Sequence, residues 1–368
     1  MSALALRHFR NLENQELEIP PEGLALVGDN AQGKSNFLEA IYYLETFRSF
    51  RGARDEQLVR FGQDVFRVVG STTADEEVVE VAAAFERKGK RKKVSVNGRE
   101  AERLGDALGR TAAVIFSPAD LELVSGGPRE RRRFLDIVLS LNQPGYLGAL
   151  QEYRQVLTRR NAALKAGEPG SVVSAWAPGL VRSGSEVIAA RKAWVEGVTH
   201  AFGAYYERVS QEATARMTYR PGVPLGGSET IEQIVEAFRD ALAEGTERDR
   251  RLGTTGVGPH RDDVRLDLER GDGLDLRDYG SGGQKRTAAL ALRLVEAKTI
   301  RERRGAAPLV LLDDVFAELD PGRSERVLEV MEGEETGQVL LTAPKDADVR
   351  IKRDSLARWR IIAGRICA

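Results

Sequence analysis

The most constraining feature of this sequence is a glycine-rich loop between an apolar strand and a helix. The loop fits the pattern Gly-x-x-x-x-Gly-Lys-Ser/Thr at every fixed position, with Gly28, Asp29, Asn30, Ala31, Gln32, Gly33, Lys34 and Ser35, followed by Asn36. An apolar run at residues 24–27 precedes it, and a helical pattern follows from Phe37. Such glycines let backbone N–H groups turn toward a phosphate, and the helix N-terminus adds positive charge. We therefore expect residues 28–36 to bind a nucleotide, with Lys34 at its β- and γ-phosphates. A glycine-rich turn with a chance lysine is the alternative, and the flanking elements argue against it.

A second apolar run ends in two carboxylates, as a phosphate-binding loop of this kind requires. Residues 309–312 read Leu-Val-Leu-Leu and are followed by Asp313 and Asp314. At the tip of a buried strand, Asp313 is expected to hold Mg²⁺ opposite the Ser35 hydroxyl. Asp314 is placed to polarise an attacking water as a general base. Alone, two such aspartates mark only a strand that meets solvent. Together with the loop, they predict a metal site at Ser35 and Asp313 and a catalytic pair at Asp313 and Asp314.

A third segment opens a long Ala/Leu-rich helix and reads Ser281, Gly282, Gly283 and Gln284. Alone it is usually a helix cap, but its N–H groups also form an anion site. One subunit cannot use two such sites on the same γ-phosphate if they lie on opposite sides of a domain. Two subunits facing head to tail can, and residues 317–320, after the acidic strand, would lie at the same seam. The order of the segments predicts an ATP-dependent homodimer with ATP between the subunits.

Changes of hydrophobic period along the chain predict a discontinuous domain. Short strands dominate before residue 117 and return after residue 258, whereas the period from about 118 to 252 is helical. Continuous apolar strands that alternate with helices are typical of parallel strands buried on both faces. We expect an α/β fold in which residues 1–117 and 254–368 form one domain, with a mixed sheet and additional antiparallel strands. Residues 118–253 are expected to form a mainly helical lobe without a long coiled coil.

Composition limits the class of protein. The 368 residues carry 55 Lys+Arg and 56 Asp+Glu, a net charge of −1, which excludes a uniformly basic coat but not a local basic surface. The single cysteine, Cys367, cannot form an internal disulfide or a zinc site by itself. No run approaches the ~18 apolar residues of a membrane helix, and Arg7 precedes any signal-peptide core. We therefore expect a soluble, cytoplasmic protein with no membrane association.

In this order the segments resemble an ABC-type ATPase head of the branch that includes the structural-maintenance-of-chromosomes (SMC) proteins. Further detail resembles the RecF family of bacterial recombination and repair proteins, over residues 4 to about 345. The matching stretches are Phe-Arg-Asn at 9–11, the loop at 28–35, Leu-Glu-Ala-Ile at 38–41, Phe-Ser-Pro-Ala-Asp-Leu at 116–121, Arg-Arg-Arg-Phe-Leu-Asp at 131–136, Gly-Pro-His-Arg-Asp-Asp at 258–263 and Leu-Asp-Asp-Val at 312–315.

The resemblance implies an ABC-type ATPase head that binds ATP and Mg²⁺ and dimerises on ATP. It also implies binding to double-stranded or gapped DNA, help in loading the RecA recombinase during recombinational repair and the SOS response, and RecR as a bridging partner. Two departures bear on turnover: Thr342 stands where many transporter ATPases have a histidine, and Asp314 is shorter than the glutamate common in them. We expect a weak DNA-dependent ATPase in which ATP acts more as a clamp than as fuel.

Basic residues supply the candidate DNA contacts. The densest run, residues 87–93, is predicted to be a hairpin tip, and several arginines surround the start of a helix near residue 131. A solvated tip and structural ion pairs are the alternative interpretations. Contacts to the phosphate backbone are sequence-independent and sensitive to salt. The candidate residues are Lys88, Lys90, Arg91, Lys92, Lys93, Arg131 and Arg132.

Three other functions stay open. A phosphotransferase acting on a small molecule would need no Ser281 segment and would work as a monomer. An ATPase subunit of a membrane transporter would be stimulated by a membrane partner. A structural DNA clamp with vestigial hydrolysis would release DNA independently of Asp314.

Overall fold

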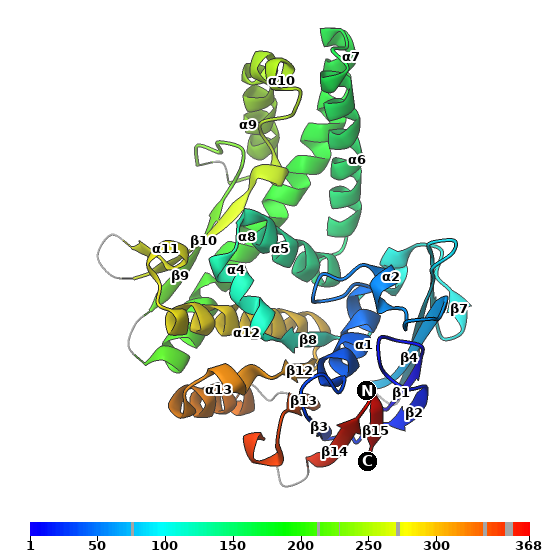
Figure 1. Cartoon of the computed structure of the whole chain (residues 1–368). Coiled ribbons are helices and arrows are strands. Elements are labelled where there is room, and N and C mark those ends of the chain that lie inside the picture. The colour runs from blue at the N-terminus through cyan, green and yellow to red at the C-terminus, as the bar shows by residue number, and fades with distance from the viewer. Residues whose placement is uncertain (75–76, 212–213, 228, 270–272, 334–336, 350–355) are drawn as a thin grey trace. The chain divides into compact units, whose positions relative to one another are not determined.

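The apolar run before the phosphate-binding loop is a middle strand of a mixed six-stranded sheet (Figure 1). The structure is a computed structural model that describes all residues except 75–76, 212–213, 228, 270–272, 334–336 and 350–355. All neighbouring strands of this sheet are parallel except for the antiparallel pair of β14 and β15. The spatial order is β15 (Arg365–Cys367), β14 (Ala357–Ile362), β3 (Gly23–Val27), β13 (Val339–Ala343), β12 (Leu309–Asp313) and β8 (Ala113–Phe116).

A second six-stranded sheet is antiparallel and contains the basic hairpin. Its order is β2 (Gln15–Glu18), β1 (Ala3–Arg7), β4 (Val65–Ala74), β5 (Glu77–Glu86), β6 (Arg91–Val96) and β7 (Arg99–Glu100). The turn between β5 and β6 comprises only residues 87–90. The prediction that the tip extends through residue 93 was therefore wrong, because Arg91, Lys92 and Lys93 pair with β5 as part of β6.

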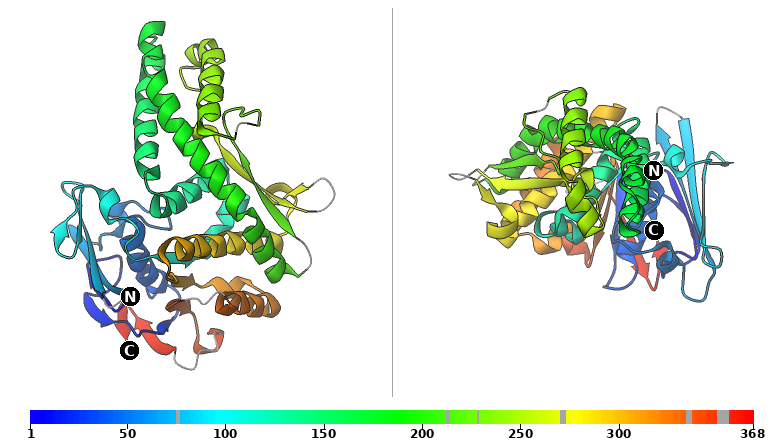
Figure 2. Two further views of the ribbon diagram at one scale, coloured as in Figure 1. Left: turned by 180° about the vertical axis from the view of Figure 1, so that it is seen from behind. Right: turned by 90° about the horizontal axis from the view of Figure 1, so that it is seen from above.

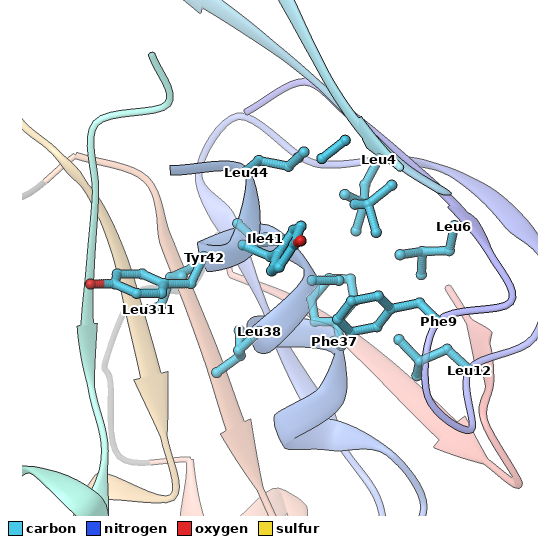
Figure 3. Close-up of a cluster of buried hydrophobic side chains, with 14 of the residues drawn as sticks. Leu4, Leu6, Phe9, Leu12, Phe37, Leu38, Ile41, Tyr42, Leu44 and Leu311 are labelled. Carbon is cyan, nitrogen blue, oxygen red and sulfur yellow. The ribbon is translucent and has the colours of Figure 1, made fainter. Parts of the chain in front are cut away.

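Helix α1 (Lys34–Thr46) lies between these two sheets and is buried along nearly its whole length. Figure 3 shows its apolar side chains meeting the N-terminal strand on one side and β12 on the other. Phe37 and Ile41 belong to the same cluster as Leu4, Leu6 and Leu311. The charged residues Lys34, Glu39 and Glu45 of this helix are buried as well. The loop that precedes α1 is therefore attached to a helix in the core of the domain.

The chain divides into two compact units, which we call the head and the lobe. The head comprises Met1–Asp120, Arg208–Gln211 and Leu290–Ala368, and the lobe comprises Leu121–Glu207 and Glu212–Ala289. The lobe was predicted to begin at residue 118, close to its observed start at Leu121. It was predicted to end at residue 253, but it continues to Ala289. The reason is that β10 (Asp263–Leu268) pairs with β9 (Ala215–Arg220), which holds the following residues in the lobe. The further head helices are α2 (Asp55–Leu58), α3 (Leu104–Ala107), η1 (Pro118–Asp120), η3 (Val315–Glu318), α13 (Pro321–Gly333) and η4 (Asp346–Asp348).

The lobe is mainly helical, as predicted, but it also contains a three-stranded sheet of β11 (Leu274–Asp275), β10 and β9. Sequence reasoning missed β9, in which Ala215, Met217 and Tyr219 alternate toward the core. The long helices α6 and α8 pack along each other (Figure 2). The lobe helices are α4 (Leu121–Ser125), α5 (Pro128–Asn142), α6 (Tyr146–Lys165), α7 (Gly170–Ser174), most of α8 (Ala177–Ser210), α9 (Ile231–Glu244), α10 (Thr246–Leu252), η2 (Pro259–Arg261) and α11 (Leu276–Tyr279). Helix α12 (Gly282–Arg304) begins in the lobe and continues in the head.

One charged residue interrupts the apolar stripe of α8 and organises the lobe core. Arg191 is 2% exposed. Its guanidinium donates to Asp136 Oδ1 at 2.7 Å, Asp262 Oδ2 at 2.6 Å, the Tyr146 hydroxyl at 3.0 Å and the Pro259 carbonyl at 2.7 Å. Burial raises the pKa of Asp262, and the charge of Arg191 opposes that shift. The arginine thus ties α8 to α5, α6 and the η2 loop.

Replacing Arg191 with methionine is expected to lower the stability of the lobe by about 3–5 kcal/mol, because the carboxylate of Asp262 would stay buried without its cation. Asp136 would keep its ion pair with Arg154. Urea unfolding followed by tryptophan fluorescence would measure the change in a Trp359→Phe background, in which only Trp176 and Trp194 of the lobe fluoresce.

The neighbouring Lys192→Met variant is the matched control. Lys192 forms an ion pair with Glu196 on the surface of the helix, at 2.9 Å, and its loss should cost only about 0.3–0.5 kcal/mol. Equal effects of the two substitutions would contradict a central role for Arg191.

Candidate nucleotide-binding site

The phosphate-binding loop connects the end of β3 to the first turn of α1, as the sequence predicts. Gly33 precedes the helix with φ 115°, a left-handed conformation that favours glycine. A Cβ atom on Gly33 would lie 2.8 Å from Asn11 Oδ1, and one on Gly28 would lie 2.5 Å from the Ile361 carbonyl oxygen. Within the described residues, no side chain caps the N-terminus of α1. Its first N–H groups are therefore available to a phosphate.

Lys34 reaches back over the loop. Its Nζ donates to the carbonyl oxygens of Gly28 at 2.7 Å and Asp29 at 3.1 Å, and the residue is 5% exposed. The ammonium group is thus held within the loop, beside the N–H groups of the helix start. This concentration of positive charge suits the terminal phosphates of a nucleotide.

Three adjacent strand ends bring the other predicted groups to the same place. The register pairs Asp313 with Thr342 and Thr342 with Leu26, so β12, β13 and β3 end side by side. Ser35 Oγ donates to Asp313 Oδ1 at 2.8 Å, although the two residues are 278 positions apart. Thr342 Oγ1 donates to the same oxygen at 3.0 Å. The structure therefore joins the two predicted metal-binding residues directly.

The two aspartates differ in their surroundings. Burial raises the pKa of Asp313, and hydrogen bonds from Ser35 and Thr342 oppose the shift. Burial also raises the pKa of Asp314, against the opposing charge of Lys34. Asp314 has a left-handed backbone with φ 49°, and its N–H donates to Thr342 Oγ1 at 3.1 Å. Its buried Oδ1 has no partner among the described residues. Asp314 is thus the more available base.

Asp314 also borders open space. It lines a pocket together with Phe316, Leu319, Pro344 and Asp348, and with two residues at the end of β13. A carboxylate with a raised pKa at the edge of such a pocket can accept a proton from a water molecule.

Ser35 and Asp313 suit Mg²⁺ more than a metal held by protein alone. The described residues contain no group of three or more His, Cys, Asp or Glu side chains arranged to hold a metal ion. Mg²⁺ is commonly bound through one or two carboxylates, waters and the phosphates of the substrate. A hydroxyl and a carboxylate oxygen 2.8 Å apart beside a phosphate-binding loop fit that mode of binding.

The Ser281 segment forms a helix cap on the surface of the lobe. Ser281 Oγ accepts from the Gln284 N–H at 3.2 Å, and Gln284 Oε1 accepts from the Ser281 N–H at 2.8 Å. Ser281 and Gly282 are exposed, and a Cβ atom on Gly282 would meet nothing within 4 Å. The N-terminus of α12 is thus open to an approaching group. The segment at 317–320, which was predicted to lie at the same dimer seam, falls partly on η3 in the head, where the side chains of residues 317 and 318 lie outside the described part.

Three residues at this site had no role assigned from the sequence. Asn11 Nδ2 donates to the Gln32 carbonyl at 3.2 Å and so braces the loop. Thr342 joins both aspartates, as described above. Ser117 follows Phe116, which pairs with Leu312, so the register places it next to Asp313. Its buried hydroxyl has no partner among the described residues. Asn11 and Ser117 belong to the matching stretches at 9–11 and 116–121, and this was the only signal available for them.

The predicted basic contacts separate into two groups. Lys88, Lys90, Arg91 and Lys93 are exposed on the hairpin, and Lys90 and Lys93 form only exposed ion pairs, with Glu56 and Glu100. Lys92 differs, because its Nζ binds Asp55 at 2.8 Å and the Phe47 carbonyl at 2.6 Å. Burial lowers its pKa. Lys92 therefore has a structural partner set and is poorly placed to contact a ligand.

The two lobe arginines are also engaged within the protein. Arg131 is 5% exposed and binds both carboxylate oxygens of Asp263, at 2.7 and 3.0 Å. Arg132 donates to the Asp262 carbonyl at 2.6 Å. These bonds favour structural ion pairing over DNA contact for Arg131. Arg132 is half-buried, so part of its side chain can still be reached by a ligand.

A family model and curated relatives match nearly the whole chain. The family model described as the RecF/RecN/SMC N terminal domain matches residues 1–358. The DNA replication and repair protein RecF of Synechococcus sp. strain JA-3-3Ab is 40% identical over 346 residues, which cover 92% of this chain and 90% of that protein. The protein of the same name from Geobacter sp. strain M21 is 35% identical and covers 99% of this chain and 98% of that protein.

Two solved structures have the same fold as this chain. A recombination mediator protein RecF with ATP, from the RecFOR pathway, superposes with a TM-score of 0.89 at 30% identity, over 99% of this chain and 96% of that one. The SMC head domain of Pyrococcus furiosus, at 18% identity, has a TM-score of 0.58 over 100% of this chain and 94% of that one, and it shares the fold alone. The predicted ABC-type head with an inserted lobe is confirmed. In the described part of the chain, no helix is both long and apolar enough to span a membrane.

Proposed function

This chain belongs to the RecF family of DNA replication and repair proteins, and on that premise we propose that it is an ATP-dependent DNA clamp. Two copies would dimerise on ATP, close on double-stranded or gapped DNA, and release it after slow hydrolysis. The observation that supports this proposal is the hydrogen bond from Ser35 to Asp313, which joins the glycine-rich loop to a strand-end carboxylate from a distant part of the sequence.

The head residues would divide the chemistry among them. The N–H groups of the loop and Lys34 would bind the β- and γ-phosphates of ATP, and Ser35 and Asp313 would hold Mg²⁺. When bound, the ion offsets the negative charge of the phosphate oxygens. Asp314 would orient the attacking water and accept its proton, with Thr342 holding the Asp314 backbone in place.

Dimerisation would use the exposed cap of α12. The Ser281 hydroxyl and the free N–H groups beside it would meet the γ-phosphate held by the other subunit. Because each subunit would offer its Ser281 segment to the ATP bound by the other, one dimer would hold two ATP molecules between its subunits.

DNA would be held by its phosphates. The exposed hairpin residues Lys88, Lys90, Arg91 and Lys93 are the remaining candidates, together with Arg132, whereas Lys92 and Arg131 are withdrawn because their charges are satisfied internally. Such contacts are independent of base sequence and weaken steeply with salt.

The cellular role follows from the family alone. We place the protein in the cytoplasm, where it would mark gapped or damaged DNA for RecA loading during recombinational repair and the SOS response. RecR would act as the bridging partner. A related protein is described as a recombination mediator of the RecFOR pathway.

Replacing Asp314 with asparagine tests the hydrolytic step. The variant keeps the size of the side chain but removes the base, so we expect ATP to bind normally and single-turnover hydrolysis to slow roughly 10²- to 10⁴-fold. Release of a fluorescent duplex after ATP addition should slow in parallel.

The control is Asp348→Asn, which changes an exposed carboxylate of η4 on the same pocket. It should hydrolyse ATP at close to the normal rate. If the Asp314→Asn variant hydrolyses ATP more slowly but releases DNA at the normal rate, hydrolysis does not drive release. The protein would then be a structural clamp with vestigial hydrolysis.

A further inference from the structure

The lobe contains an open groove. None of the residues that line it is assigned to the nucleotide site. It lies between α7, the start of α8, α9 and α10, and its volume is about 590 Å³. All of its lining residues belong to the lobe. The groove is therefore a feature of one unit.

The floor of the groove is aliphatic. Val173, Val181 and Leu242 are buried beneath it, and Val235 is half-buried. No aromatic residue is among its lining residues. Burial of apolar side chains of a ligand against such an aliphatic surface would stabilise the complex. Single-stranded nucleic acid, in contrast, is usually held by stacking of its bases on aromatic rings. The floor therefore favours a protein segment over a nucleic acid.

The charge of the groove is all of one sign. Four arginines line it and no aspartate or glutamate does, in a chain that has 55 basic and 56 acidic residues. Arg160 is neutralised by Asp249 at 2.8 Å, and Arg182 by Glu152. Arg239 and Arg250 are exposed, and the described part of the chain offers neither of them an ion pair. Two guanidinium groups are thus available at the rim.

We propose that this groove binds a short segment of a partner protein that combines apolar side chains with carboxylates. The apolar side chains would cover the aliphatic floor, and the carboxylates would pair with Arg239 and Arg250. An arginine binds a carboxylate through two parallel hydrogen bonds, so the rim would select acidic segments and set their direction. The groove shares no residue with the nucleotide site, and its proposed ligand goes beyond the DNA clamp proposed above.

The test uses the full chain and a panel of fluorescein-labelled hexapeptides. Each peptide contains three residues chosen from leucine, isoleucine and phenylalanine, and three aspartates, in different orders. A matched panel has lysine in place of aspartate. Fluorescence anisotropy should show saturable binding of acidic peptides, at least tenfold tighter than their lysine counterparts and weakened by added salt.

Charge reversal at the rim locates the site. The double variant Arg239→Glu/Arg250→Glu should weaken the binding of acidic peptides at least tenfold, and Val235→Asp should weaken it through the floor. The control is Arg248→Glu/Arg251→Glu, which reverses two exposed arginines of α10 that do not line the groove. It should bind within about twofold of the unchanged protein.

Three results would overturn the proposal. The first is that no acidic peptide binds, or that both double variants weaken binding equally. The second is that the rim variant loses affinity for duplex DNA while its control does not, which would make the groove a nucleic-acid surface. The third is that the rim variant abolishes self-association in the absence of peptide, which would make the occupant a second copy of the chain. ATP binding should be normal in all variants, so failure here is distinguishable from failure of the proposed clamp.

Discussion

Replacing Lys34 with alanine is expected to lower the affinity for ATP by roughly 10- to 150-fold, and to abolish ATP-dependent dimerisation. The ammonium group lies inside the phosphate-binding loop, 2.7 Å from the Gly28 carbonyl oxygen, and would exchange that contact for phosphate oxygens. A hydrogen bond to a charged group contributes about 1.5–3 kcal/mol, and each 1.4 kcal/mol changes the dissociation constant about tenfold. Titration with a fluorescent ATP analogue would measure the loss.

The control for this substitution is Lys88→Ala, which removes an exposed lysine from the hairpin of the same unit. It should leave ATP affinity unchanged. The Lys34 variant must also unfold at a urea concentration close to that of the unchanged protein, since the residue is buried. A correctly folded Lys34→Ala protein with normal ATP affinity would contradict the assignment of the loop.

Replacing Ser281 with arginine is expected to separate ATP binding from dimerisation. The residue is exposed and contributes no atom to the loop at residues 28–35, so each subunit should still bind ATP. The dimer should weaken at least roughly tenfold, because each of its two equivalent sites would lose a hydrogen bond to a charged phosphate. The longer side chain would also occupy the space in front of the helix N-terminus.

The substitution also removes a helix cap, which by itself costs about 0.5–2 kcal/mol. Ser281→Thr is therefore the appropriate control, because threonine keeps both the hydroxyl and the cap. It should dimerise on ATP like the unchanged protein. A normal nucleotide-bound dimer of the Ser281→Arg variant would exclude a role for this segment across the subunit interface.

The parts of the site that were predictable from the sequence are those fixed by local geometry. The loop needs an apolar strand before Gly28 and a helix after Gly33, and all three signals are contiguous. Likewise, a buried strand that ends in Asp313 must present that carboxylate at the edge of a parallel sheet. The two halves meet because β3 and β12 flank the same strand, β13. Strand order was not predicted, and it is what brings Thr342 between them.

The errors share a different cause. Lys92 and Arg131 look like free charges in the sequence, because their partners Asp55 and Asp263 are brought to them only by the fold. Strand β9 was missed because it lies between two strongly helical segments. The boundary at 254 was misplaced for the same reason, since β9 holds β10 in the lobe. Pairing at long sequence separation leaves no local signal in a single sequence.

The proposed function requires that ATP close two copies of this chain on DNA. Sedimentation velocity of the full chain with Mg²⁺, with and without ATP and a short labelled duplex, would measure both the dimerisation and the binding of DNA. We predict that ATP converts the monomer to a dimer and that the duplex sediments with the dimer. A protein that stays monomeric with ATP and leaves the duplex free would contradict the account, reduce the Ser281 segment to a helix cap, and point to a small-molecule phosphotransferase.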